Sequence, residues 1–558
     1  MQRCSVISAL AAGACFSMLA APYAVLAQQS PIETTADLQP TPLKTTAKIQ
    51  PAGAPIPTGP NGEGLLANAL GWNRIQKKTG IVAEYYIQLG LSTNNNIQKG
   101  DPSSGGAAYS GDGNGPVATP TDADMLSIEQ IELFLHRNDK SNIVSGITPT
   151  PAPMYKHFDW GFLSDTVYGR SSKGCLMTGF DANWAMNPAA SNDAANRPMY
   201  LCEPNAFVTL YAPVLKGVSL QFGRMDDLIA IDEVPPAAQW SPNVFYSKSY
   251  GFYRDMTVVG WRIDANVFHN EKMGYLMAEF GLNNGNKTAH SLNGNLNYVY
   301  ALRYRSPKMK TEVDYSGRVG SGNIKTNSDC SMAGCTMRVK PVWASDDQDN
   351  YHVYSPNAQR SFENGLKVAQ EIGQKLKVTG LMQFGKQFGD GKASTIAVYS
   401  PAVVSSTSYA LDLSICNIPT PSQTPYCRAG FTGASFLSYE GKATYTIVPK
   451  KLNASARLEQ FRNPNGYFGQ PVFSVISNTY NKDAYNGNPP NWGGAKGAFN
   501  ETTLNLNYNP IRALRLRPEI RYDWQSGNYV NKAFGRSNPN GMTSSSQFTA
   551  SIDAIISF

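Results

Sequence analysis

The sequence lacks any long apolar run after its first 27 residues. The chain has 558 residues, and no later stretch reaches the roughly eighteen consecutive apolar residues that a membrane-spanning helix needs. Apolar residues spaced 3.6 positions apart, which indicate an amphipathic helix, are nearly absent after residue 78. These absences argue against a helical membrane protein and against a soluble chain of several mixed domains.

Charge and reactive side chains are also scarce. Charged residues make up 16% of the chain, the formal net charge is +7, and no run of Lys or Arg marks a nucleic-acid partner. The chain has five His, no CxxC pair and no GxSxG motif. We therefore expect no catalytic residue, no cofactor, no metal site and no nucleic-acid binding. A hydrolase with Ser or Asp beside a His stays as a minor alternative.

The last twelve residues, Gln547–Phe558, alternate between apolar and polar. One face carries Phe548, Ala550, Ile552, Ala554, Ile556 and Phe558. The other face is polar except for Ile555. A period of two predicts a β-strand with two different faces, and about ten tilted residues can cross a bilayer. An edge strand of a soluble sandwich is the alternative.

Similar segments recur from Gly80 onward, and sixteen strands are predicted. They are 80–92, 126–137, 157–168, 206–212, 217–224, 256–267, 274–283, 293–305, 309–319, 361–372, 376–388, 434–447, 452–462, 499–509, 512–524 and 546–558. Most even-to-odd links are short and the odd-to-even links are long, with Asn138–Lys156 as the exception. Short periplasmic turns and long external loops are typical of outer-membrane barrels. We predict an all-β fold, a closed antiparallel transmembrane barrel of about 16 strands (14 or 18 as alternatives), with the first strand paired to the last.

The N-terminal part divides by composition. Residues 1–27 have one basic residue, an apolar stretch and a small-residue end at Val25-Leu26-Ala27, which predicts a cleaved signal peptide. A lipoprotein site at Cys15 is the alternative. Residues 28–64 are rich in Pro and Thr and predict a flexible linker. Residues 65–79 predict a short periplasmic helix, and 80–558 the barrel domain.

Six cysteines follow the predicted signal peptide, and each pair lies within one long link. The pairs are Cys175 with Cys202, Cys330 with Cys335, and Cys416 with Cys427. An even number of cysteines in an exported chain indicates disulfides, here local closures of external loops. A metal site is the alternative.

A sheet crosses lipid only as a closed barrel, because every backbone polar group must be paired. Aromatic girdles belong on the lipid face, and Tyr304, Tyr445, Tyr508, Tyr522 and Trp524 fit them. The opposite faces are ionic. Since about sixteen strands leave a water channel, we expect these charges to face water.

Several stretches resemble a known family. Asp159–Phe162 with Val167–Gly169, Tyr211–Arg224, Asn243–Tyr250 and Leu516–Asp523 are similar to the second family type of outer-membrane β-barrel porins. The resemblance covers roughly residues 80–558 and implies a Gram-negative outer-membrane channel for passive diffusion of small hydrophilic solutes and ions. The last strand resembles those whose terminal aromatic, here Phe558, is an assembly signal. Expected partners are outer-membrane lipid and the barrel assembly machinery, with a homotrimer or a monomer open. A structural or adhesive barrel with a filled lumen is the alternative.

The pore-lining and constriction residues follow from the inward faces and from one link. They are Asp226, Asp227, Asp232, Glu233, Arg262, Asp264, Arg303, Arg305, Arg318, Arg457, Arg515, Arg517 and Arg521. The link Met225–Asp255 is expected to fold into the lumen, with its acids facing the arginines of the thirteenth and fifteenth strands across the channel. In the alternative, the link lies outside and those arginines pair with the wall acids Glu459, Glu519 and Asp523.

Overall fold

The computed structural model describes the barrel wall and parts of its links. The described residues are 69–96, 125–169, 177, 179–181, 200–227, 243–244, 257–285, 289, 296–320, 336–337, 361–388, 396–398, 411–412, 426–428, 433–464, 497–511, 513–527, 532, 534–538 and 541–557. The chain divides into two units, Met1–Pro51 and Ala52–Phe558. The first unit lies outside the described residues, and every element below belongs to the second. The predicted signal peptide and linker, and Phe558, also lie outside them.

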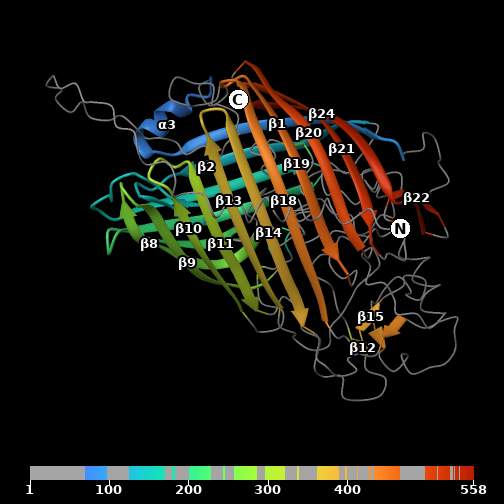
Figure 1. Ribbon diagram of the computed structural model, residues 1–558. Coiled ribbons are helices and arrows are strands. Elements are labelled where there is room, and N and C mark those ends of the chain that lie inside the picture. The colour runs from blue at the N-terminus through green and yellow to red at the C-terminus, as the bar shows by residue number, and fades with distance from the viewer. Residues whose placement is uncertain are drawn as a thin grey trace, which may run out of the picture. The chain divides into compact units, whose positions relative to one another are not determined.

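Sixteen strands of the described residues join in one closed barrel (Figure 1). In ring order they are β1 (Val82–Asn94), β2 (Met125–Arg137), β5 (Asp159–Gly169), β6 (Tyr200–Ala212), β7 (Val218–Asp226), β8 (Thr257–Asn270), β9 (Gly274–Asn283), β10 (Asn297–Arg305), β11 (Thr311–Gly320), β13 (Ser361–Ile372), β14 (Leu376–Phe388), β18 (Gly433–Val448), β19 (Leu452–Asn463), β20 (Gly497–Ile511), β21 (Leu514–Ser526) and β24 (Ser546–Ser557). All neighbours are antiparallel, and β1 pairs with β24 with Ile87 opposite Ile556. The predicted fold class, strand number and closure are confirmed.

The remaining elements are short. They are the helix α3 (Trp72–Thr79) and the strand pairs β3 (Ile143–Val144) with β4 (Thr148–Pro149), β12 (Thr336–Met337) with β16 (Leu411–Asp412), β15 (Ile396–Val398) with β17 (Tyr426–Arg428), and β22 (Phe534–Asn538) with β23 (Gly541–Ser544). The helix lies within the predicted 65–79 segment and ends at Gly80, whose φ of 77° is left-handed. Within the described part of the chain, no helix is both long and apolar enough to span a membrane.

The links are sorted between the two ends of the barrel as predicted. The turns 213–217, 271–273, 306–310, 373–375 and 449–451, and the connection from β20 to β21, lie at one end, called here the short-turn end. The opposite, long-loop end carries the longer connections. The one long link at the short-turn end, Asn138–Phe158, contains β3 and β4. Its residues fold as a small hairpin, which sequence patterning did not indicate.

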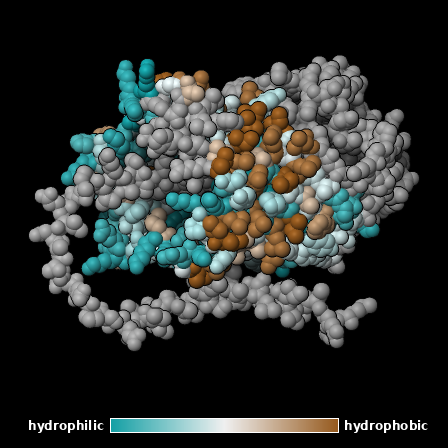
Figure 2. All heavy atoms as spheres, turned by 90° about the horizontal axis from the view of Figure 1, so that it is seen from above, coloured by the Kyte–Doolittle hydropathy of each residue, from teal (hydrophilic) through white to brown (hydrophobic). Residues whose placement is uncertain are grey.

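The outer face of the wall is apolar and exposed. Leu126, Phe222 and Leu458 are 72%, 63% and 61% exposed, and Figure 2 shows hydrophobic side chains gathered on one such face. Tyr445 and Tyr522 of the predicted aromatic girdle are exposed there too. Because a soluble protein seldom exposes so large an apolar surface, this face is suited to lipid.

The apolar exception in the last strand has a partner inside the barrel. Ile555 is buried against Tyr86 and Phe134, with Leu163 packed on the same cluster. The rings of Tyr86 and Phe134 meet edge to face at 5.9 Å between centroids. These side chains come from β24, β1, β2 and β5, so a small apolar cluster lines the inside of the seam where the barrel closes.

Candidate functional site in the barrel lumen

The inner face of the wall carries the predicted charged residues. Nine of them lie on barrel strands and are at most 5% exposed: Arg262, Asp264, Arg303, Arg305, Arg318, Arg457, Arg515, Arg517 and Arg521. On β21, buried Arg515, Arg517 and Arg521 alternate with outward residues such as Ile520, which is 46% exposed. Period two therefore placed these side chains on the correct face. Asp232 and Glu233 lie outside the described residues.

The arginines on β19 and β21 are held by acids of the wall. Arg457 Nε lies 2.7 Å from Glu501 Oε1, and Arg521 Nη2 lies 2.8 Å from Glu501 Oε2. Arg521 also pairs with Asp523 on its own strand at 3.0 Å. Arg517 forms an ion pair with Asp553 on β24. Asp523 was a predicted wall partner, whereas Glu501 and Asp553 were not singled out.

Several of these charged side chains are enclosed by their partners and do not face open water. The side chains of Arg457, Arg517 and Arg521 are 0% exposed, as are those of Glu501 and Asp523. The reason is cross-strand geometry, which brings an acid from a neighbouring strand within hydrogen-bond reach of each guanidinium. Buried charges persist when such pairing offsets their desolvation.

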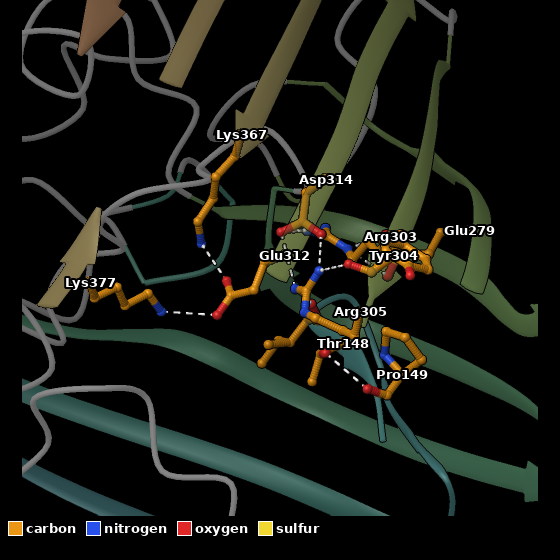
Figure 3. Close-up of polar contacts among 11 residues, drawn as sticks. Thr148, Pro149, Glu279, Arg303, Tyr304, Arg305, Glu312, Asp314, Lys367 and Lys377 are labelled. Carbon is orange, nitrogen blue, oxygen red and sulfur yellow. Dashed lines mark hydrogen bonds and ion pairs between the residues drawn. The ribbon is translucent and has the colours of Figure 1, made fainter. Parts of the chain in front are cut away.

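A second group of ion pairs lies on β9, β10 and β11 (Figure 3). Arg303 Nε is 3.1 Å from both carboxylate oxygens of Glu279, and its Nη1 is 3.7 Å from Asp314. Arg305 donates to both oxygens of the same Asp314. Beside them, Glu312 accepts from Lys377 at 2.9 Å. This arc of the lumen is therefore also internally paired.

The link after β7 does reach the lumen. Val244 N donates to Glu519 Oε2 at 2.8 Å, Asn243 Nδ2 donates to the same oxygen at 3.1 Å, and Arg517 Nη1 donates to the carbonyl of Asn243 at 2.9 Å. All four residues are buried. Since β7 and β21 are the fifth and fifteenth strands of the ring, the link extends from its own wall to a distant one.

The acids at the start of this link face other arginines than expected. Asp227 lies 3.5 Å from Arg318 on β11, and Arg262 on β8 donates to the backbone carbonyl of Asp226 at 3.2 Å. The reason is that β7 extends to Asp226, which pairs with Thr257 on β8 and fixes both acids beside that strand. The contacts with β21 come instead from the uncharged Asn243 and Val244.

One buried charged pair was missed. Arg224 on β7 forms an ion pair with Asp181, stands over the ring of Phe180 at 5.2 Å, and donates to Thr257 at 3.0 Å. Asp181 also accepts from the backbone of Met177 and Glu203. Asp181 belongs to a link without periodicity, so the sequence offered no signal for the pair beyond Arg224 itself.

Cys202 lies on the barrel wall, not in a loop as expected. β6 begins at Tyr200, six residues before the predicted 206, because Pro204 and polar neighbours interrupt the alternation on which the prediction relied. Cys202 is buried. Cys427 is in β17. Cys175, Cys330, Cys335 and Cys416 lie outside the described residues.

A closed antiparallel barrel with an apolar outer face and a charged inner face defines an outer-membrane channel of the porin class. The chain belongs to the family described as "Putative beta-barrel porin-2, OmpL-like", whose model matches residues 84–558. It is accordingly a diffusion porin of the outer membrane, and the predicted family is confirmed. No curated protein matches the chain.

Solved structures that are similar to this chain include outer-membrane channels. The channel DcaP of Acinetobacter baumannii is 11% identical, with 86% of this chain and 97% of that chain covered and a TM-score of 0.43. The anion-selective porin from Comamonas acidovorans is 10% identical, with 86% and 99% covered and a TM-score of 0.41. Salmonella typhi OmpF, solved with daunomycin, is 10% identical, with 86% and 97% covered and a TM-score of 0.42.

Proposed function

We propose that this porin passes small hydrophilic solutes and ions passively through its lumen. The observation that carries the proposal is the charged inner face of a closed sixteen-stranded wall. A barrel with a filled lumen and a structural or adhesive role is the second candidate, and the burial of the inward arginines favours it. We propose no catalytic activity for either case.

Conductance separates the two candidates. The purified protein in a planar bilayer should give steady single-channel steps in salt. Proteoliposomes should swell in small sugars, more slowly as sugar size increases. A correctly folded, heat-modifiable barrel that gives neither current nor swelling would leave only the structural or adhesive role.

We further propose that the thirteen predicted residues line the narrow part of the pore. Asp226 and Asp227 would act with Arg262 and Arg318 on one side, while Arg515, Arg517 and Arg521 form the opposite side. This arrangement is supported by the ion pair of Asp227 with Arg318 and by the contacts of Asn243 with β21. Fixed charges of both signs near a constriction orient dipolar solutes and tune ion passage.

Export and loop closure are proposals of the same kind. We propose that residues 1–27 are removed after export, that 28–64 form a flexible linker, and that the short-turn end faces the periplasm.

The three disulfides proposed are Cys175–Cys202, Cys330–Cys335 and Cys416–Cys427. Mass mapping without reductant tests the pairs, and six free thiols would contradict them. Reduction should loosen loops and leave the wall folded, because each bridge closes only a local loop.

For partners, we propose outer-membrane lipid, the barrel assembly machinery and a homotrimer. The exposed apolar outer face supports the first. Removing Phe558 should sharply lower the amount of folded barrel in the outer membrane while export continues. Normal amounts of the shortened protein in that membrane would count against Phe558 as an assembly signal. Cross-linking followed by size analysis tests the trimer.

A further inference from the structure

The hairpin at the short-turn end is built into the lumen. The side chain of Asn142 donates to Lys216 O at 3.0 Å, and the backbone N of Thr150 donates to Asn142 O at 3.0 Å, which closes the base of the hairpin. Asn142, Ile143 and Thr148 are buried. At its root, burial raises the pKa of Asp139 above its usual value, although the Ser141 hydroxyl donates to that carboxylate. The segment is therefore packed against the barrel.

The tip of this hairpin is hydrogen-bonded to three strands of the inner wall. The Ser145 hydroxyl donates to the Ser219 hydroxyl on β7 at 2.7 Å. Arg262 Nη2 on β8 donates to Ser145 O at 3.2 Å, and Arg305 Nη2 on β10 donates to Ile147 O at 3.3 Å. Figure 3 shows Thr148 and Pro149 of the same hairpin beside Arg305. Inward arginines thus bind backbone carbonyls, and the tip lies inside the wall.

There is no spare room at this contact. Gly146 has a φ of +71°, and a Cβ built on it would lie 1.9 Å from Arg262 Nη2. The guanidinium occupies the place that any other side chain would take. The hairpin can therefore pack closely against Arg262 because residue 146 has no side chain.

One side chain at the tip is not packed away. Ile147 is 55% exposed, although its carbonyl binds the inward-facing Arg305. Arg305 itself is held by Asp314, so its charge is locally balanced. The tip therefore presents an uncharged, apolar group next to a neutralised ion pair.

We propose that the Asn142–Thr150 hairpin narrows the pore at its short-turn end and that Ile147 is a specificity-determining residue that limits solute size. The inference rests on the diffusion-pore function. The tip carries no charge, and the arginine and carboxylate beside it balance each other. It therefore narrows the passage without adding an electric field, so it selects solutes by size and not by charge. The hairpin belongs to the one long link at the short-turn end and is separate from the link that reaches β21.

Thiol modification of Ile147→Cys tests the proposal. The matched control is Phe158→Cys, which lies in the same link and is 77% exposed, two residues before the outward Trp160. Both variants and the parent are treated with a bulky neutral methanethiosulfonate reagent during single-channel recording. Modification of the Ile147→Cys variant should lower conductance by roughly a third or more, with the reversal potential unchanged. Modified Phe158→Cys and the treated parent should conduct as before.

Two results would overturn the hairpin proposal. One is complete modification of the Ile147→Cys variant, confirmed by mass, with unchanged conductance. The other is an introduced thiol at position 147 that does not react in the folded barrel. A parent that conducts in either case keeps the porin role intact, whereas a folded parent without current would argue against that role itself.

Substitutions at two glycines provide a second test of the hairpin contact. Gly146→Ala forces the tip and the Arg262 guanidinium apart, whereas Gly373→Ala has a similar φ of +65° in another short turn with nothing within 4 Å of its Cβ. Backbone strain is thus matched, and only Gly146→Ala should change conductance and the sugar size cutoff. Equal effects of the two variants, or none from Gly146→Ala in a folded barrel, would contradict the seating of the hairpin.

Discussion

Two segments enter the lumen from opposite ends, and they are held by different chemistry. The hairpin from the short-turn end offers backbone carbonyls of Ser145 and Ile147 to arginines of the wall. The link after β7 offers Asn243 and Val244 to the carboxylate of Glu519. The hairpin contact depends on where its backbone carbonyls lie, and the link contact depends on the charged carboxylate of Glu519. Changes at the hairpin should therefore act on pore size, and changes at the link on ion selectivity as well.

The reach of the two segments differs too. The hairpin contacts β7, β8 and β10, all of which follow its root at β5 within the first half of the ring order. The link joins residues 276 positions apart, Asn243 and Glu519. The hairpin contacts need only the strands from β5 to β10, whereas the contact of the link with Glu519 also needs β21, near the end of the ring order. The link contact is thus the more sensitive to changes on β21.

The largest effect is expected from reversing charge on β21. Arg517→Glu removes both the ion pair with Asp553 and the donor to Asn243 O, and losing one partner of a buried pair costs about 3–5 kcal/mol. Conductance should rise and the reversal potential in a salt gradient should move toward cations. Arg515→Glu makes the same charge change and should move the reversal potential with a smaller conductance change. If both conduct like the parent, these arginines do not line the constriction.

A smaller effect is expected from Glu519→Gln. The amide oxygen can still accept from Val244 and Asn243, but a neutral acceptor is weaker than a charged one by about 1 kcal/mol. The conductance of Glu519→Gln should be higher than that of the parent and lower than that of Arg517→Glu. Glu459→Gln is the control, since this buried carboxylate on β19 accepts from Ser438 and loses the same charge. Identical recordings from the two variants would show that charge alone, and not the link, determines the result.

The smallest effect is expected from locking the hairpin. Ser145 and Ser219 hydroxyls lie 2.7 Å apart, so the double variant Ser145→Cys/Ser219→Cys should form a disulfide. Because the hairpin is already seated, oxidation should leave conductance and gating unchanged, with Ser145→Cys alone as the control. The cross-link is checked by mass mapping. A clear change in current on oxidation would show instead that the hairpin moves during conduction.

The wall was predictable from the sequence because alternation is a local property. Residues such as Arg521 and Tyr522 are neighbours with opposite environments, and period two alone assigned one to the lumen and the other to the outer face. Alternation also predicted sixteen strands, and the sorting of links by length supported a closed barrel in which β1 pairs with β24. Even Ile555, the exception to alternation, was correctly placed on the inner face.

The contacts of the inward side chains could not be predicted in this way. Whether Arg517 meets Asp553 or a loop depends on register between strands, and the course of Asn243 to Glu519 depends on the closed ring. The hairpin around Gly146 has no periodicity, and its seat on Arg262 is a steric fit between distant residues. The sequence by itself determines the face that each wall residue takes, because successive side chains of one strand point to opposite faces. The partners in the lumen depend on the folded barrel, because they come from contacts across strands that no local pattern encodes.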